Sequence, residues 1–298
     1  MKINVYQVDV FSSKPFGGNP AAVVLNAEDL SNEDMQNIAR EMNLSETIFV
    51  NPINERNYEI RFFTPTEEVD LCGHGTIGTF YVLVLKDYIK PMNNGIKKVY
   101  QYTKAGKLSV DIYFHNGNID NIFMEQAPPI DFGDVKHIGD LLKCFSIKIE
   151  DIGIDKEYVN PRIISTGLKD ILLPINKKEV LDNLKVDFNR LEDFTNKLEV
   201  VGVHAFHLPN VNSGKVYTRN FAPAVGIKEE AATGTSNGAL VYFLKSRKYI
   251  HGNEIISIQG ETMGRPSFIH CQIFKDNENY RIKIGGKAIM VLEGTIYF

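Results

Sequence analysis

The feature of this sequence that most constrains its fold is a pair of related segments, one in each half of the chain. The first starts at Arg61 and reads RFFTPTEEVDLCGHGTIGTFYVL, and the second starts at Arg219 and reads RNFAPAVGIKEEAATGTSNGALVYFL. In both, an arginine, a phenylalanine and a proline precede an acidic stretch and a glycine that opens an apolar segment. Such a repeat predicts two duplicated domains that face each other, with two helix N-termini meeting at one cleft.

The chain is long enough for two such domains. It has 298 residues, 43% of them apolar, which is enough for a large core without disulfide or metal staples. Its three cysteines, Cys72, Cys144 and Cys271, are far apart and form no CxxC pair. This usage predicts a reduced, cytoplasmic protein without a disulfide framework.

Charge and hydropathy argue against two classes of partner. The formal net charge is −4, which disfavours binding to nucleic acid or to an anionic membrane. The longest apolar run, residues 80–85, is far shorter than the roughly 20 residues that span a bilayer. The N-terminus alternates like a strand and lacks the apolar segment of a signal peptide, so we expect a cytoplasmic protein.

Strand-like segments dominate both halves, and a few helical segments interrupt them. Ser31 and Asp34 predict the capped start of an amphipathic helix, and residues 75–86 predict a helix that is apolar all round and therefore buried. Two prolines at 128–129 mark the boundary between the halves. A matching helix is expected over residues 235–248. This order of elements predicts an α+β fold.

Three motifs suggest other chemistries but lack the required context. The run at residues 73–78 matches GxGxxG, yet it does not follow the first strand and has no acidic residue about 20 positions later. The GxSxG match at residues 234–238 has no interleaved strands and helices after it. His204 and His207 lie on opposite faces of a predicted strand. We therefore expect no nicotinamide cofactor, no serine nucleophile and no metal.

The two matching glycine turns are the better candidates for a site. The free N–H groups of a helix's first turn bind anions, so Gly73 and Gly234 could each open a turn that holds a carboxylate or a developing negative charge. Glu46 follows the first helix, at the start of a strand. Glu229 and Glu230 precede the second turn, where they could be acids or helix caps.

Several motifs together resemble one family. The segments VDVF, PFGGNPAAVV, LSETIFV, RFFTP, DLCGHGT, RNFAP and EEAATGTSNGAL occur in order between residues 8 and 240, and their combination resembles the phenazine-biosynthesis-like (PhzF-type) family. The resemblance implies the diaminopimelate-epimerase fold, an α+β architecture of two pseudo-symmetric domains. Each domain would be a mostly antiparallel or mixed sheet wrapped around a central helix, with the active-site cleft between them. We expect an N-terminal domain of residues 1–127 plus 286–298 and a C-terminal domain of residues 128–285.

The resemblance also implies the site residues. The acid/base glutamate of the family falls on Glu46, its histidine on His74, and its second acid on Glu230, where the family commonly has Asp. A substitution that displaces a catalytic group by about 1 Å can be costly, so the second acid is the weaker assignment. Residues expected to bind substrate are Asn19, Ser45, Cys72, Gly73, Thr233, Gly234 and Thr235.

The chemistry that follows is a cofactor-independent isomerisation of a small carboxylic acid. One carboxylate would move a proton between two carbons, for which we expect burial to raise its pKa toward neutrality. Related epimerases use two thiols, and this chain has Cys72 at the first position but Thr233 at the second. Two alternatives remain: an epimerase or racemase of a small amino or hydroxy acid, and a non-catalytic carboxylate-binding or interaction protein. The resemblance suggests a homodimer.

Overall fold

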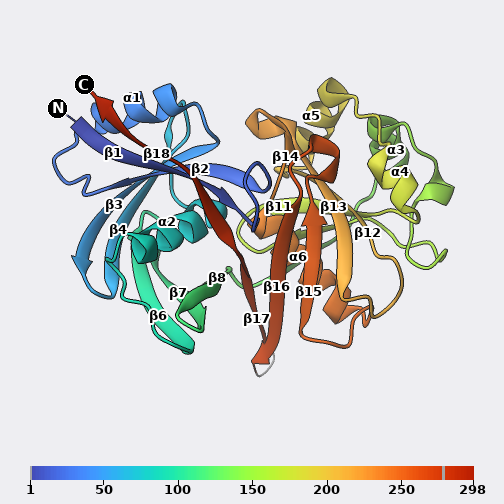
Figure 1. Ribbon diagram of the computed structural model, residues 1–298. Coiled ribbons are helices and arrows are strands. Elements are labelled where there is room, and N and C mark those ends of the chain that lie inside the picture. Colours follow the sequence, from blue (N-terminus) through green and yellow to red (C-terminus); the bar gives the residue numbers. More distant parts are fainter. Residues whose placement is uncertain (1, 277–278) are drawn as a thin grey trace. The chain divides into compact units, whose positions relative to one another are not determined.

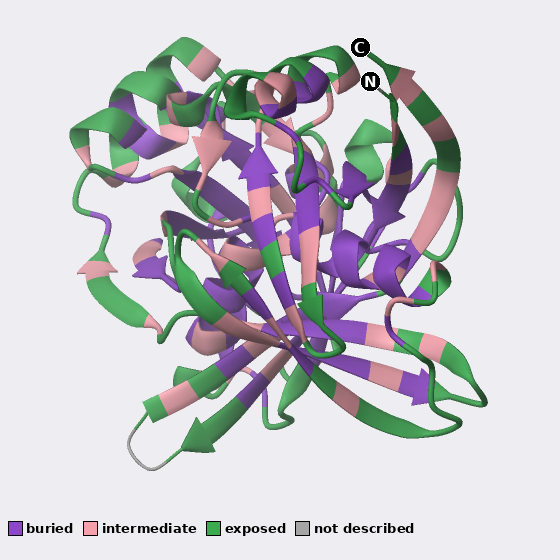
Figure 2. Cartoon of the chain, turned by 90° about the vertical axis from the view of Figure 1, so that its left-hand side faces the viewer, coloured by how far each residue is buried: buried purple, intermediate pink, exposed green. Residues whose placement is uncertain are grey.

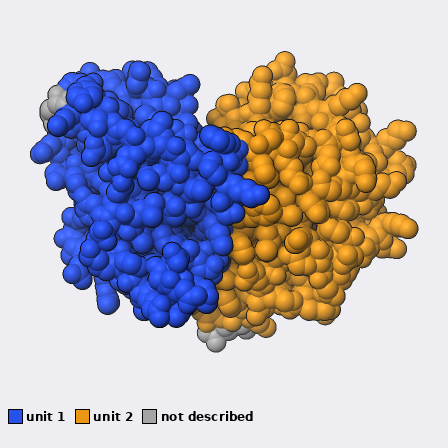
Figure 3. Space-filling model, viewed as in Figure 1, with its two compact units in different colours: residues 1–125, 285–298 blue, residues 126–284 orange. Residues whose placement is uncertain are grey.

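The structure, a computed structural model, describes residues 2–276 and 279–298. The chain divides into two compact units (Figure 3): unit 1 comprises Met1–Glu125 and Gly285–Phe298, and unit 2 comprises Gln126–Ile284. Among the described residues, no helix is both long and apolar enough to cross a membrane.

Unit 1 is built mainly from strands, with two helices (Figure 1). Its elements are β1 (Lys2–Val10), β2 (Asn19–Leu25), α1 (Asn32–Met42), β3 (Glu46–Asn54), β4 (Asn57–Phe63), β5 (Glu68–Val69), α2 (Gly73–Leu85), β6 (Gly95–Thr103), β7 (Gly106–His115), β8 (Asn118–Glu125) and β18 (Ala288–Tyr297). The C-terminal strand β18 pairs antiparallel with the N-terminal strand β1.

Unit 2 has a similar order of elements with additional short helices. These are β9 (Ile130–Asp134), α3 (Ile138–Phe145), β10 (Arg162–Ser165), β11 (Lys169–Pro174), α4 (Lys178–Asp182), α5 (Phe188–Lys197), β12 (Gly202–His207), β13 (Lys215–Ala222), β14 (Ile227–Glu230), α6 (Gly234–Ser246), β15 (Glu254–Gln259), β16 (Ser267–Asp276) and β17 (Asn279–Gly286). The last two residues of β17 belong to unit 1.

The strand pairings of the two units follow the same scheme. In unit 1, β1–β2 is antiparallel, β2–β3 parallel, β3–β4 antiparallel, β4–β6 parallel and β6–β7 antiparallel. In unit 2, the pairs β10–β11, β11–β12, β12–β13, β13–β15 and β15–β16 have the same orientations in the same order. The repeat seen in the sequence therefore extends to whole sheets, which are mixed as expected.

Each unit has a central helix that is buried on nearly every side. Helix α2 packs against β1, β2, β3, β8 and β18, and helix α6 packs against β10, β11, β15 and β16. A helix that is apolar all round needs such surroundings. Gly78 lets α2 approach β1, because a Cβ there would lie only 2.8 Å from the Val8 side chain.

The other helices bury a single face. Helix α1 has the predicted cap, in which Ser31 and Asp34 bond reciprocally, and it covers one side of the unit 1 sheet with Met35, Ile38 and Ala39. Helices α3 and α5 join the apolar core of unit 2 in the same way. Burial differs from strand to strand (Figure 2). Buried residues alternate with more exposed ones along the first part of β16, whereas β2 and β12 are buried along nearly their whole length.

The three predicted helices are present as α1, α2 and α6, with small changes at their ends. Strand β9, by contrast, has no comparable signal in the sequence. Four of its five residues are exposed, so it lacks the apolar alternation that marks a strand in sequence. It forms through pairing with β10, which is a tertiary interaction.

Candidate active site

Unit 1 brings together three polar side chains from two elements. Glu46 is the first residue of β3, Cys72 is the N-cap of α2, and His74 is the second residue of that helix. The His74 Nε2 atom lies 3.0 Å from the Glu46 Oε2 atom. On the other side of the ring, the His74 Nδ1 atom lies 3.4 Å from the Cys72 Sγ atom. The imidazole is therefore held between a carboxylate and a thiol.

A fourth residue contacts the same ring. The amide nitrogen Nδ2 of Asn19 lies 3.4 Å from His74 Nδ1, and Asn19 is 2% exposed. Asn19 is the first residue of β2. Asn19 is one of the residues expected to bind substrate, and it also contacts His74.

The carboxylate and the imidazole shift each other's titration. Burial would raise the pKa of Glu46, but the positive charge of His74 and hydrogen bonding from His74 and Cys72 together outweigh burial and hold that pKa below the ordinary value of 4.5. Burial would lower the pKa of His74, yet the neighbouring Cys72 sulfur and the Glu46 carboxylate raise it well above 6.5. The expectation of a raised pKa for Glu46 was therefore wrong, because the sequence did not show the cation beside it.

Cys72 caps the N-terminus of helix α2. Its sulfur accepts a hydrogen bond from the Gly75 N–H at 3.3 Å, in the position of an N-cap side chain. Burial and the nearby Glu46 carboxylate raise the pKa of the thiol. The neutral thiol is thus favoured over the thiolate that acts as a base in cysteine chemistry.

The same three residues are the place in unit 1 where a cation could be held. The ligand atoms of Glu46, Cys72 and His74 lie within 4.8 Å of one another. However, Glu46 and Cys72 approach different nitrogens of the ring, Nε2 and Nδ1. One ion can take only one nitrogen of an imidazole, so this geometry fits an ion pair with a neighbouring thiol better than a ligand set.

In unit 2, the corresponding turn at the start of α6 carries hydroxyl and amide groups. Thr233 is its N-cap, and the Thr233 hydroxyl donates to the Glu230 Oε2 atom at 2.7 Å. The buried side chain of Gln259 donates to the Thr233 hydroxyl at 3.1 Å. Glu230 is the last residue of β14, and sequence reasoning gave no role to Gln259.

Glu229 is neither a helix cap nor part of this group. Its carboxylate accepts two hydrogen bonds from Arg219, at 2.8 Å and 2.9 Å. Unit 1 repeats the pair with Arg61 and Glu68, at the same two distances. The acidic residue common to the two repeats is therefore an arginine partner, and the possibility that Glu229 caps α6 was wrong.

Unit 2 also buries two titratable groups, Asp170 and His204, of which the sequence pointed only to His204, as a metal ligand that was not expected. Asp170 accepts a hydrogen bond from the Ser236 hydroxyl at 2.6 Å, and burial raises its pKa to about 6. The His204 Nδ1 atom lies 3.0 Å from the Asn220 Oδ1 atom, and burial lowers the pKa of His204 to about 4. Both lie in the interior of unit 2 and cannot reach a substrate as they stand.

The remaining predicted substrate residues differ in exposure. Ser45, just before β3, is exposed, whereas Gly73, Gly234 and Thr235 are partly buried in the first turns of α2 and α6. All are surface-accessible to some degree, and their contact with a substrate stays a prediction. The prediction that the two turns share one cleft also stays a prediction.

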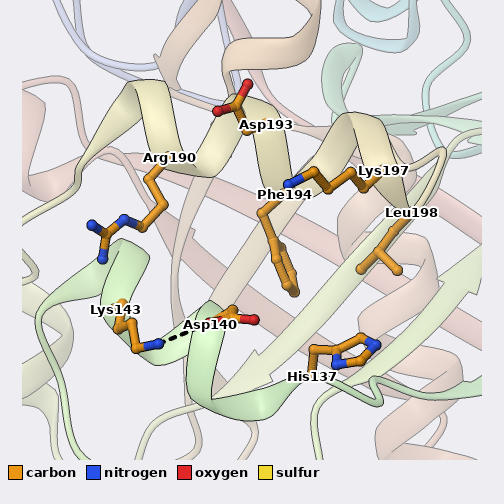
Figure 4. A pocket seen from close by; sticks show the side chains of 8 residues that line it. All are labelled: His137, Asp140, Lys143, Arg190, Asp193, Phe194, Lys197 and Leu198. Carbon is orange, nitrogen blue, oxygen red and sulfur yellow. Dashed lines mark hydrogen bonds and ion pairs between the residues drawn. The ribbon is translucent and has the colours of Figure 1, made fainter.

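A pocket of about 510 Å³ lies elsewhere on unit 2, between α3 and α5 (Figure 4). Its rim carries charges of both signs, and Lys143 is already paired with Asp140 at 2.9 Å. Phe194 and Leu198 contribute apolar surface. Because side chains of both charges line the pocket, its charge favours neither an anion nor a cation. None of the predicted site residues lines this pocket.

Comparison with known proteins identifies the family. The profile of the phenazine biosynthesis-like protein family matches residues 8–294, so the chain belongs to that family. It is 33% identical to an uncharacterised isomerase of Clostridium acetobutylicum over 99% of this chain and 98% of the relative. It is 31% identical to a trans-2,3-dihydro-3-hydroxyanthranilate isomerase of Pseudomonas fluorescens over 98% of this chain and 99% of the relative. The chain is an isomerase of the PhzF-type family.

Solved structures agree on the fold. A PhzF-family protein of Bacillus anthracis covers 100% of both chains with a TM-score of 0.88 and 28% identity. A hydroxyproline epimerase of Agrobacterium vitis covers 99% of this chain and 91% of its own, with a TM-score of 0.65 and 11% identity. The second likeness concerns the fold alone, and it confirms that the α+β fold is of the diaminopimelate-epimerase type.

Proposed function

We propose that this isomerase moves a proton from one carbon to another within a small carboxylic acid, without a cofactor, and that Glu46 carries the proton. The observation that carries this proposal is the contact of Glu46 with His74 at 3.0 Å, beside the first turn of α2. It joins a carboxylate, a buried cation and a helix N-terminus in one place.

The proton transfer balances without an external reagent. The Glu46 carboxylate takes a proton from a carbon next to a double bond, and the C–H electron pair forms a new double bond. The old double bond moves its pair to a second carbon, which takes the proton back from Glu46. Because substrate and product have the same composition, neither oxidant nor reductant is needed.

The lowered pKa of Glu46 affects the two halves of this sequence differently, because it keeps the carboxylate ionised but makes it a weaker base. Glu46 is ionised at neutral pH and therefore able to accept a proton. Its conjugate acid is correspondingly strong, which favours return of the proton to the second carbon. The charge that develops on the substrate would be stabilised by the first-turn N–H groups of the helix.

The other predicted residues take supporting roles in this proposal. His74 holds the Glu46 carboxylate, and Cys72 and Asn19 lie beside the other ring nitrogen of His74. Glu230 assists as a second acid or orients the substrate. Ser45, Gly73, Gly234 and Thr235 bind its carboxylate and polar groups, and Thr233 acts through Glu230. The homodimer suggested by the resemblance is proposed for the assembly.

The substrate class is suggested by the relatives. The Pseudomonas fluorescens relative acts on trans-2,3-dihydro-3-hydroxyanthranilate, an unsaturated cyclic amino acid, so this compound heads a panel of dihydroaromatic, hydroxy and amino acids. Two-thiol epimerisation gains no support here. Its second thiol is replaced by Thr233, and burial keeps Cys72 protonated.

The test is proton NMR in D₂O with the wild type, Glu46→Gln and the exposed control Glu67→Gln. We expect the wild type and Glu67→Gln to bring deuterium to one carbon of a panel compound. Glu46→Gln should lower the rate by about 10²–10⁴-fold, since a missing general acid/base costs that much. Full exchange by Glu46→Gln would contradict the proposal.

A further inference from the structure

One buried side chain organises the surroundings of Glu230. Gln259, at the end of β15, is 0% exposed. Its Oε1 atom accepts from the Thr233 N–H at 3.3 Å and from Asn237 Nδ2 at 3.0 Å. Its Nε2 atom donates to the Glu230 backbone oxygen at 2.8 Å and to the Thr233 hydroxyl at 3.1 Å. The whole hydrogen-bonding capacity of the amide is used.

These contacts leave only one orientation for the amide. A backbone N–H can only donate and a backbone carbonyl can only accept. The Thr233 N–H therefore requires the Gln259 oxygen on its side, and the Glu230 carbonyl requires the nitrogen on the other. Since Gln259 Nε2 donates to the Thr233 hydroxyl, the proton of that hydroxyl points to Glu230 Oε2, 2.7 Å away.

We propose that Gln259 is a positioning residue, which directs the Thr233 hydroxyl at the Glu230 carboxylate and so keeps that carboxylate oriented and ionised. This inference deepens the proposed function, because it rests on the role of Glu230 as the second acid. A carboxylate that accepts a hydrogen bond holds its charge more readily. The glutamine thus acts on the acid through an intermediate hydroxyl.

The segment after Gln259 supports the same turn. The Ser267 hydroxyl donates to the Ala231 backbone oxygen at 2.7 Å. Gly260 has a φ of +75°, and a Cβ there would lie 2.8 Å from the same oxygen. Residues 231–233 are therefore held by backbone and side-chain contacts from residues 259–267. The segment that follows β15 therefore stabilises the turn next to Glu230.

The variant Gln259→Glu tests the proposal, because a carboxylate has nearly the same shape but cannot donate when ionised. The Thr233 hydroxyl should then turn to the new acceptor. Glu230 would lose the hydrogen bond from the Thr233 hydroxyl and gain a like charge nearby, which raises its pKa by about one unit or more. Thr233→Val removes the donor without adding charge and should produce a smaller rise.

The measurement is a carbon NMR titration of the full-length protein with labelled glutamate side chains. The Glu230 signal is assigned by its absence in Glu230→Gln. Gln272→Glu is the matched control, since it adds the same charge on β16 beside Glu254 and should leave the titration of Glu230 unchanged. Should Gln259→Glu fail to fold, Thr233→Val decides the question alone.

An unchanged Glu230 pKa in Gln259→Glu and in Thr233→Val would overturn the positioning role. The titration needs no substrate, so it separates this proposal from the proposed function. A wild type that exchanges no carbon-bound proton would count against the function and leave the titration result standing. With an active wild type, Gln259→Glu should also move the acidic limb of the exchange rate's pH profile upward.

Discussion

The first turns of α2 and α6 occupy matching places in the two units but carry different chemistry. Both helices have 13 residues and an extended N-cap residue, with φ of −135° at Cys72 and −127° at Thr233. The turn of α2 holds a buried ion pair between Glu46 and His74. The turn of α6 holds Glu230 with a neutral hydroxyl.

This difference shows that duplication preserved the scaffold while the side chains diverged. The elements that shape the turns are repeated, down to the paired arginine and glutamate: Arg61 with Glu68 and Arg219 with Glu229. The groups that carry chemistry are not repeated. In the β2–β3 ladder Glu46 faces Ala21, whereas in the matching β11–β12 ladder Asp170 faces Gly202.

The largest stability effect should come from separating the ion pair of unit 1. His74→Ala leaves the Glu46 carboxylate without its cation, and breaking such a pair costs about 3 kcal/mol of unfolding free energy. Thr235→Ala, at the matching helix position, should cost less than about 1 kcal/mol, because a partly buried residue without a charge is replaced. Urea unfolding at pH 6 compares the two.

The unfolding free energy lost in His74→Ala should depend on pH in a direction that the two pKa shifts define. The lowered pKa of Glu46 stabilises the fold above pH 4.5, and this contribution is lost as pH falls through the folded pKa. The raised pKa of His74 stabilises the fold below pH 6.5, and this contribution is lost as pH rises through the folded pKa. The difference in unfolding free energy between the wild type and His74→Ala should therefore be largest between pH 4.5 and pH 6.5. A difference that grows steadily outside this window would contradict the ion pair.

Unit 2 should show a different pH response, because its two buried groups act in opposite directions. Asp170, with a pKa of about 6, stabilises the fold below pH 3.8 and loses this contribution as pH rises through 6. His204, with a pKa of about 4, stabilises it above pH 6.5 and loses this contribution as pH falls through 4. Each difference of about two pKa units is worth about 3 kcal/mol.

The two contributions should largely cancel between pH 4 and pH 6 in the wild type. Asp170→Asn should expose the loss of stability toward low pH that His204 causes, and His204→Gln should expose the loss toward high pH that Asp170 causes. Urea unfolding from pH 4 to pH 7 measures both slopes. Identical pH profiles for the two variants would rule out this compensation.

A smaller effect distinguishes the two N-caps. Cys72→Ala removes the acceptor for the Gly75 N–H and should cost about 1 kcal/mol, whereas Cys72→Ser keeps an acceptor and should stay within about 0.5 kcal/mol of the wild type. Thr233 makes no side-chain cap hydrogen bond, so Thr233→Ala should not weaken α6 through capping. Thermal unfolding gives the three values.

The same cysteine variants address the alternative chemistry. If Cys72 only caps α2 and contacts His74, Cys72→Ser should retain proton exchange. Loss of exchange in Cys72→Ser, together with its retention in Glu46→Gln, would favour an epimerase-like mechanism based on the thiol.

The fold and the central helices were predictable because their signals are local. Apolar residues all round residues 75–86 and a capping pattern at Ser31 and Asp34 appear in the sequence itself. The family resemblance implied that Glu46 and His74 both belong to the site, but it did not predict their contact, and the 28 positions between them leave no local signal for it. The predicted direction of the pKa shift of Glu46 was wrong, because the shift depends on the charge of His74 beside it.

Residues that act through tertiary contacts left no signal. Gln259 ends an ordinary strand, and only the folded chain brings its amide to Thr233 and Glu230. The shifted pKa values of Asp170 and His204 also left no signal in the sequence, because burial rather than residue type sets them. Strand β9 also has no sequence signal, because it forms through its pairing with β10.

The central claim is that one carboxylate takes a proton from one carbon and returns it to another. The most direct measurement uses a substrate deuterated at the donor carbon in ordinary water, with the product analysed by mass spectrometry after a single turnover. A shuttle by Glu46 predicts that part of the deuterium appears at the acceptor carbon. A product that always carries solvent hydrogen there, even at the shortest times, would contradict a single shuttling glutamate and would point to two separate acid/base groups.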